Sequence, residues 1–152
     1  MWTKFGFFLI SLLIAGGVFY YYVYTSSYAM AQDAEALFQA GRFREAQTLA
    51  QKAYDQNQYN RKAFTILTQS GEALKWTEYI AEADRYLVQI RQMVDKERFT
   101  PADRNRIKFM CEIAIGHYAK LNQNNRLLPE SLKTEAAKRN RQIEKIYVEL
   151  FG

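Results

Sequence analysis

The sequence predicts an all-α protein, with an N-terminal transmembrane helix followed by about three antiparallel helical hairpins. Residues Phe5–Tyr24 are twenty consecutive residues without a charged side chain. Beyond them, apolar residues recur at spacings of three and four, the period of an amphipathic helix, and no alternating run is long enough for a strand. The 152 residues include only two prolines and seven glycines, so few positions break a helix.

The uncharged run is long enough to cross a membrane. At about 1.5 Å per residue, its helix would be about 30 Å long, the thickness of the hydrocarbon core of a bilayer. Trp2 precedes the run, and the tyrosine-rich segment Tyr20–Tyr24 ends it, as in the aromatic belts of spanning helices. We therefore expect a transmembrane anchor over residues 1–27 and a helical domain over residues 28–152.

A cleaved secretory signal is the alternative to an anchor. Its evidence is Ala29-Met30-Ala31, a small-x-small cleavage pattern shortly after the apolar run. The apolar core of a signal peptide usually has about 7–15 residues, and this run is longer, which favours an uncleaved span.

The charges beside the run predict its orientation. Lys4 and the terminal amine precede it, whereas Asp33 and Glu35 follow it and the first basic residue beyond it is Arg42. The positive-inside rule then places the N-terminus in the cytoplasm. In a bacterium, the protein would be a single-pass inner-membrane protein with its domain in the periplasm.

Six helices in three pairs are expected after the run. They are Ala29–Ala40 and Phe43–Gln56, Arg61–Leu74 and Trp76–Lys96, then a helix from Thr100 to about Leu121 and one from about Pro129 to Leu150. Thr100 is the strongest start signal, because its hydroxyl can cap the helix, Pro101 suits the first helical position and Asp103 meets the positive end of the helix dipole.

The first pair carries a pattern of small, large, glycine and aromatic residues: Ala34, Leu37, Gly41, Phe43, Ala46 and Ala53. This pattern resembles a tetratricopeptide repeat (TPR). The second pair resembles it loosely and the third only by length, while Asp33 and Gln58 depart from the family pattern. An ordinary α-helical bundle is the alternative. The resemblance implies binding of other proteins, with a concave face that could hold a peptide. Ala31 and Glu35 occupy the positions of the family's carboxylate clamp, so that clamp is not expected.

The sequence offers little for catalysis, and we expect no enzyme, cofactor or metal site. His117 is the only histidine and has no carboxylate three or four residues away, so a helix-surface histidine is favoured over a metal ligand. Cys111 is the only cysteine and lies among apolar residues, which indicates a buried structural thiol. The net charge of +5 is spread along the chain, so a nucleic acid is not expected as a partner. No small-molecule substrate is expected either.

Candidate partner contacts are aromatic residues outside the helical core spacing and a short basic cluster near the C-terminus. They are Tyr59, Phe99, Phe151, Lys138, Arg139 and Arg141. Exposed aromatic and arginine side chains often dominate binding at protein interfaces, and basic clusters can dock on acidic proteins or lipid head groups. A solvated helix face is the alternative for the basic cluster.

These features predict a non-catalytic scaffold or accessory subunit that acts by protein–protein interaction within a larger bacterial envelope complex. A flagellar motor, a secretion system or a respiratory assembly would each suit such a subunit. The alternative function is a regulator or inhibitor that captures a peptide on its concave helical face.

Overall fold

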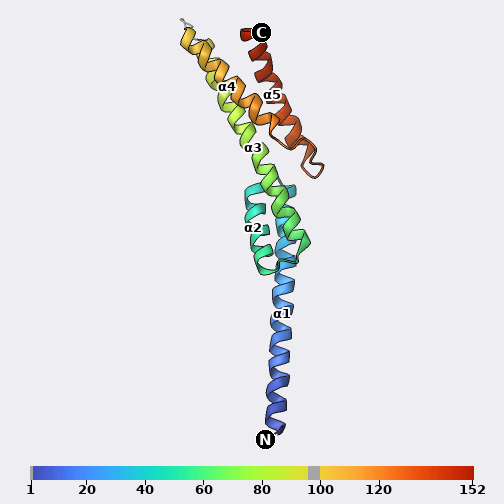
Figure 1. The fold of residues 1–152 in the computed structure, drawn as a ribbon. Helices are drawn as coiled ribbons and strands as arrows, with labels where there is room; N and C mark the ends of the chain where they lie inside the picture. The colour runs from blue at the N-terminus through green and yellow to red at the C-terminus, as the bar shows by residue number, and fades with distance from the viewer. Residues whose placement is uncertain (1, 96–99) are drawn as a thin grey trace. The chain divides into compact units, whose positions relative to one another are not determined.

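The computed structural model describes residues 2–95 and 100–152, and the side chains of residues 10–22, 25–95 and 100–152. Five α-helices occupy these residues, and no strand occurs among them. Their order is α1 (Trp2–Gln39), α2 (Phe43–Gln56), α3 (Arg61–Val94), α4 (Pro101–Ala119) and α5 (Glu130–Phe151) (Figure 1). The prediction of an all-α chain is confirmed.

The chain divides into two compact units. The first unit, Met1–Gly71, holds α1, α2 and the first turns of α3, and the second unit, Glu72–Gly152, holds the rest of α3 with α4 and α5. Helix α3 therefore contributes one part to each unit.

Helix α1 is unbroken over 38 residues, so the expected helix start at Ala29 is wrong. No proline or glycine lies between Tyr24 and Ala29, and the helix therefore continues. Within residues 10–22, 25–95 and 100–152, no helix is both long enough and apolar enough to cross a membrane. The predicted span, Phe5–Tyr24, falls partly on residues 5–9, 23 and 24, whose side chains lie outside the described residues.

The helices of the first unit pack through alanines. Six alanines are fully buried on α1, α2 and α3: Ala31, Ala34, Ala46, Ala50, Ala53 and Ala63. Ala31, Ala53 and Ala63, one from each helix, form a common cluster. Because alanine projects little beyond the backbone, helices that meet through it can approach closely. The hairpin positions Ala34, Ala46 and Ala53 thus lie between helices, and Leu37 is half-buried.

The turn between α1 and α2 is a Schellman motif with Gly41 at its centre. The Gly41 N–H donates to the Phe38 carbonyl at 3.0 Å, and the Arg42 N–H donates to the Leu37 carbonyl at 2.9 Å. Gly41 has φ of +76°, a conformation that favours glycine, as the sequence predicts. The rings of Phe38 and Phe43 meet edge to face beside the turn, with centroids 5.3 Å apart.

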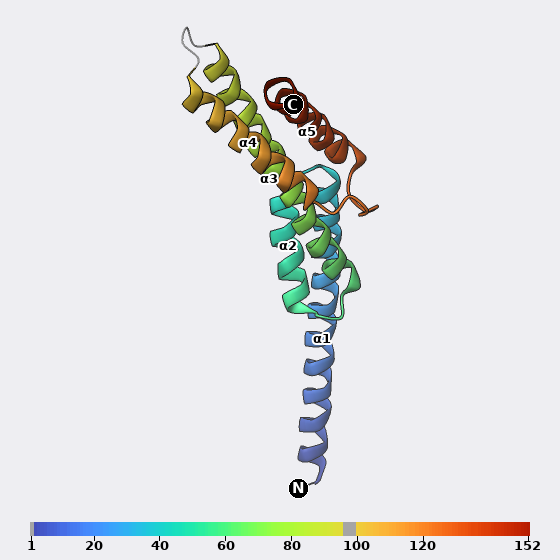
Figure 2. The same cartoon turned by 45° about the horizontal axis from the view of Figure 1, so that its top comes forward.

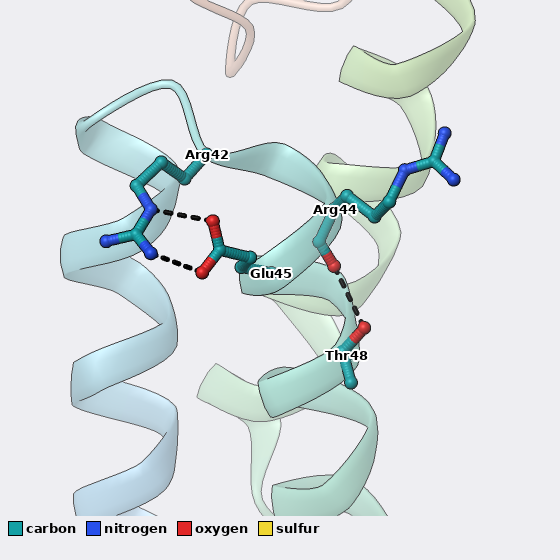
Figure 3. A network of polar contacts seen from close by, with 4 residues as sticks. All are labelled: Arg42, Arg44, Glu45 and Thr48. Atoms are coloured by element: carbon teal, nitrogen blue, oxygen red, sulfur yellow. Dashed lines mark hydrogen bonds and ion pairs between the residues drawn. The ribbon is translucent and has the colours of Figure 1, made fainter.

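Surface polar contacts follow the turn at the start of α2 (Figure 3). Arg42 Nε donates to Glu45 Oε1 at 2.7 Å, and this guanidinium lowers the pKa of the Glu45 carboxyl. Thr48 Oγ1 donates to the Arg44 carbonyl at 3.0 Å, while the Arg44 side chain points away from the Arg42–Glu45 pair (Figure 3). These groups are exposed, so the ion pair contributes little to stability.

Helix α3 continues through the break that the sequence predicts between Leu74 and Trp76, so the expected second hairpin is wrong. Leucine and lysine are both good helix formers, and neither supplies the positive φ of a tight turn. Trp76, expected to begin a new helix, is instead a fully buried residue in the middle of α3.

The second unit packs around aromatic and aliphatic side chains of α3, α4 and α5. Its buried residues include Trp76, Tyr79, Ala83, Ile90, Ile107, Met110, Cys111, Ala114, Ala136 and Ile143. Helix α4 runs beside the second part of α3 in both views (Figure 1, Figure 2). The capping prediction for α4 is confirmed, because the Asp103 N–H donates to Thr100 Oγ1 at 3.1 Å and the Thr100 N–H donates back to Asp103 at 3.2 Å.

Candidate interaction surfaces

Tyr59 lies in the turn between α2 and α3 and is 92 % exposed. Its N–H donates to Asn57 Oδ1 at 3.0 Å, and the Asn60 N–H donates to the Asn57 carbonyl at 3.0 Å. The turn backbone is therefore ordered by its own hydrogen bonds. These hydrogen bonds hold the large, amphipathic ring of Tyr59 in solvent.

Two further aromatic side chains adjoin this turn. The ring centroids of Tyr54 and Phe64 lie 5.7 Å apart, and Phe64 is 54 % exposed. Together with Tyr59 and Arg61 they line a hollow of about 490 Å³. We call the surface formed by Tyr54, Tyr59, Arg61 and Phe64 the turn surface. It combines exposed aromatic rings with one basic side chain, the composition of contact hot spots.

A buried hydrogen-bond chain fixes the turn surface to α1. Ser27 Oγ donates to the Ala53 carbonyl at 2.7 Å, and Asn60 Nδ2 donates to Ser27 Oγ at 2.9 Å. Asn60 Oδ1 accepts from the Ala63 N–H at 3.1 Å and so caps the start of α3. Ser27 and Asn60 are both fully buried. The Ser27 side chain thereby joins α1 to the end of α2 and to the start of α3.

The basic cluster of α5 provides a second exposed surface. Lys138, Arg141 and Lys145 are exposed and, with Thr134 and Gln142, line a hollow of about 440 Å³. Their spacing of three and four residues puts these cations on one face of the helix. We call the face formed by Lys138, Arg141 and Lys145 the basic face. It could accept a carboxylate-rich partner.

Arg139, also a predicted contact, serves a different purpose. Its Nε donates to Asp84 Oδ1 at 3.1 Å, it forms an ion pair with Glu135, and its side chain is only 22 % exposed. The bond to Asp84 links α5 to α3 within the second unit, and the ion pair with Glu135 lies within α5. Arg139 is therefore engaged inside the protein.

Phe151, a further aromatic candidate, packs against its neighbours. Phe151 is half-buried at the end of α5, with its ring centroid 5.5 Å from that of Tyr147 and 5.5 Å from the guanidinium carbon of Arg104. Arg104 Nη2 also donates to the Leu150 carbonyl at 2.7 Å, which ties α4 to the end of α5. Phe99 lies outside the described residues.

A histidine–carboxylate pair on α3 and α4 was not expected. His117 Nδ1 lies 2.7 Å from Glu82 Oε2, and Glu82 Oε1 accepts from the Tyr86 hydroxyl at 3.0 Å. The pair borders a hollow of about 450 Å³ that Lys75 and Lys120 also line. Because the partners are separated by 35 residues, only tertiary packing reveals them. His117 and Glu82 form a hydrogen-bonded pair, and among the described residues no serine, threonine or cysteine lines the hollow with them.

Across the described parts of the chain, no three His, Cys, Asp or Glu side chains gather closely enough to hold a metal ion. Cys111 is buried as predicted, and burial raises the pKa of its thiol to about 11. A thiol that stays protonated near neutral pH is a weak nucleophile.

Comparisons with known proteins return nothing for this chain. No family model, curated protein or solved structure matches it.

Proposed function

We propose that this protein is a non-catalytic, membrane-anchored adaptor that binds other protein subunits of a bacterial envelope complex. Helix α1 would hold it in the inner membrane, with the N-terminus in the cytoplasm and the helical units in the periplasm. The resemblance of its first hairpin to a tetratricopeptide repeat supports protein binding as the activity.

The unbroken course of α1 is the observation that carries the proposal. Its early part exposes large apolar side chains on every side, each between 56 % and 73 % exposed: Ile10, Leu12, Leu13, Ile14, Val18 and Phe19. Its last part supplies the buried residues Ala31 and Ala34 of the first unit. A helix that is apolar all round requires apolar surroundings, and a lipid bilayer provides them.

The same helix favours an uncleaved anchor over a signal peptide. Cleavage after Ala31 would remove Ser27, which holds the end of α2 and the Asn60 cap, together with the buried Ala31 itself. It would also cut α1 eight residues before its end at Gln39. A mature chain that begins at Gln32 would therefore lack part of the core of its first unit.

The basic face is the proposed partner site. Three exposed cations on one side of α5 complement a protein surface rich in carboxylates, and such complementarity speeds association and selects the partner. Arg139, on the same helix, is excluded from this role because its side chain is only 22 % exposed and is bonded to Asp84 on α3.

Affinity purification of the full-length chain from bacterial membranes in mild detergent tests the proposal. We expect stoichiometric partner subunits to co-purify, and the triple variant Lys138→Glu, Arg141→Glu, Lys145→Glu to lose them. The matched control is Arg91→Glu, Arg106→Glu, Lys120→Glu, which makes the same charge change at exposed positions on α3, on α4 and at the C-cap of α4.

Two results would contradict the proposal. A chain that stays in the supernatant after membranes are pelleted has no anchor. Equal loss of partners in both triple variants would show that net charge, not the basic face, determines binding. A ligand that exchanges within minutes, in place of stable subunits, would favour the peptide-capturing regulator.

A further inference from the structure

The turn surface lies at the level where the predicted span of α1 ends. Ser27 follows Tyr24 by three residues, which is about 4.5 Å along a helix axis. The side chain of Ser27 contacts the Ala53 carbonyl and Asn60, so the end of α2 and the start of α3 are fixed beside that level of α1.

The direction of α2 brings the turn still closer to the span. Helix α2 runs back alongside α1 toward the N-terminal part of that helix in both views (Figure 1, Figure 2). Residues after Ala53 therefore lie on the N-terminal side of Ser27. Gln56, three residues beyond Ala53, is about 4.5 Å farther along, which returns the chain to about the level of Tyr24. Tyr59 follows in the turn itself.

We propose that the turn surface is a second membrane contact, which inserts Tyr59 into the head-group layer of the bilayer that α1 enters. This inference rests on the proposed anchor function of α1. The head-group and interfacial layer is about 5–7 Å thick on each side of the hydrocarbon core, so a turn at the level of Tyr24 lies within it.

The chemistry of the turn surface suits this layer. Tyrosine is enriched at membrane–water interfaces, because its ring is apolar and its hydroxyl stays hydrated. Tyr59 is 92 % exposed and Phe64 is 54 % exposed, so apolar area is available to the lipid without rearrangement. Arg61 can pair with lipid phosphate. The nearby carboxylate of Asp55, exposed on α2, accepts a hydrogen bond from Gln51 Nε2 at 2.7 Å.

Two contacts on one rigid hairpin have a mechanical consequence. A single helix can rotate about its axis and tilt within the bilayer. A second contact fixed to α1 through Ser27 would restrict that rotation.

A depth measurement on the full-length chain tests this inference. An environment-sensitive fluorophore is attached to Tyr59→Cys in phosphatidylcholine vesicles, with a nitroxide quencher on the lipid head group. The matched control is Arg44→Cys, exposed at the opposite end of α2, about 20 Å away along the helix. Cys111 is buried, so labelling of the folded protein near pH 7 spares it.

We expect the lipid-borne quencher to reduce fluorescence severalfold more at position 59 than at position 44, and aqueous iodide to show the reverse order. Equal quenching at both positions, in protein that floats with the vesicles, would overturn the inference and leave the anchor intact. Failure of the unlabelled chain to float with the vesicles would overturn both the anchor and this second contact.

Discussion

Ser27 and Ser70 are two fully buried serines whose hydroxyls differ in their surroundings. Ser27 Oγ joins Ala53 and Asn60, whereas Ser70 Oγ has no hydrogen-bond partner among the described residues. A lost hydrogen bond that leaves a buried partner unsatisfied costs about 1–3 kcal/mol, but removal of an unsatisfied hydroxyl relieves a cost.

We therefore predict opposite effects for the two alanine substitutions. Ser27→Ala should lower the thermal midpoint of the first unit, because Asn60 Nδ2 loses its acceptor and the Ala53 carbonyl keeps only the Asn57 N–H as a donor. Ser70→Ala should leave the midpoint unchanged or raise it. Melting curves followed by circular dichroism measure both. Equal destabilisation by the two variants would contradict the role assigned to Ser27.

Gly41 and Gly116 form a second matched pair. A Cβ at either position would meet no heavy atom within 4 Å, so space does not distinguish them. Gly41 has φ of +76°, whereas Gly116 lies inside α4. Gly41→Ala should cost about 1 kcal/mol from backbone strain, and Gly116→Ala should stabilise by about 0.5–1 kcal/mol. Urea unfolding measures both, and a stabilising Gly41→Ala would be inconsistent with the Schellman turn.

At the scale of elements, α3 decides between a repeat of short hairpins and a long shared helix. Lys75→Pro would remove a helical N–H and place a ring against the preceding turn, which costs about 3 kcal/mol or more in a helix interior. The same proline would be tolerated in a turn between two helices.

We predict that Lys75→Pro lowers helicity and stability strongly, whereas Lys75→Ala changes them little. Lys75 forms a surface ion pair with Glu72, and its side chain is 62 % exposed, so the alanine variant isolates the backbone effect. Circular dichroism and urea unfolding give the comparison. A proline variant as stable as the alanine variant would restore the predicted break between Leu74 and Trp76.

The helices themselves were largely predictable, because their periodicity and local signals are strong. The Thr100 cap and the Gly41 turn depend on neighbouring residues alone, and both are present. The continuity of α3 was missed because a family pattern suggested a turn where the local residues favour a helix.

The surfaces were only partly predictable, because they depend on distant residues. Exposure of Tyr59 and of the α5 cations follows from loop position and helix spacing. The Ser27–Asn60 bond joins residues 33 positions apart, and the His117–Glu82 contact joins residues 35 positions apart. A local sequence pattern does not predict such contacts.

At the scale of the whole molecule, buried titratable groups make stability depend on pH. Burial raises the pKa of Cys111 from the ordinary value of 9.0 to about 11, and also raises that of Tyr79. The folded state therefore keeps protons that the unfolded state releases. The stabilisation is complete below about pH 9 and is lost as pH rises toward 11.

We predict that the second unit loses stability between about pH 9 and 11, and that Cys111→Ala reduces this loss. Urea midpoints of both proteins at pH 7, 9 and 10.5 provide the test. Parallel pH profiles would show that the Cys111 thiol has the same pKa in the folded and the unfolded chain, contrary to the raised pKa.

The last prediction concerns where the chain can be cut without loss of the first unit. A fragment of residues 25–152 lacks the predicted span but keeps Ser27 and Ala31, so its hydrogen-bond chain and alanine cluster remain complete. A fragment of residues 32–152 corresponds to cleavage after Ala31 and lacks both. We expect the longer fragment to unfold cooperatively.

In the shorter fragment, Asn60 lacks the hydroxyl of Ser27, and Ala53 and Ala63 lack their packing partner Ala31. The first unit should therefore melt at a lower temperature or without a sharp transition. The second unit, residues 72–152, is intact in both fragments and serves as the internal control. Amide hydrogen exchange separates the two units. Equal protection of α2 in both fragments would show that residues 25–31 are dispensable for folding, and a cleaved signal peptide would then be compatible with the structure.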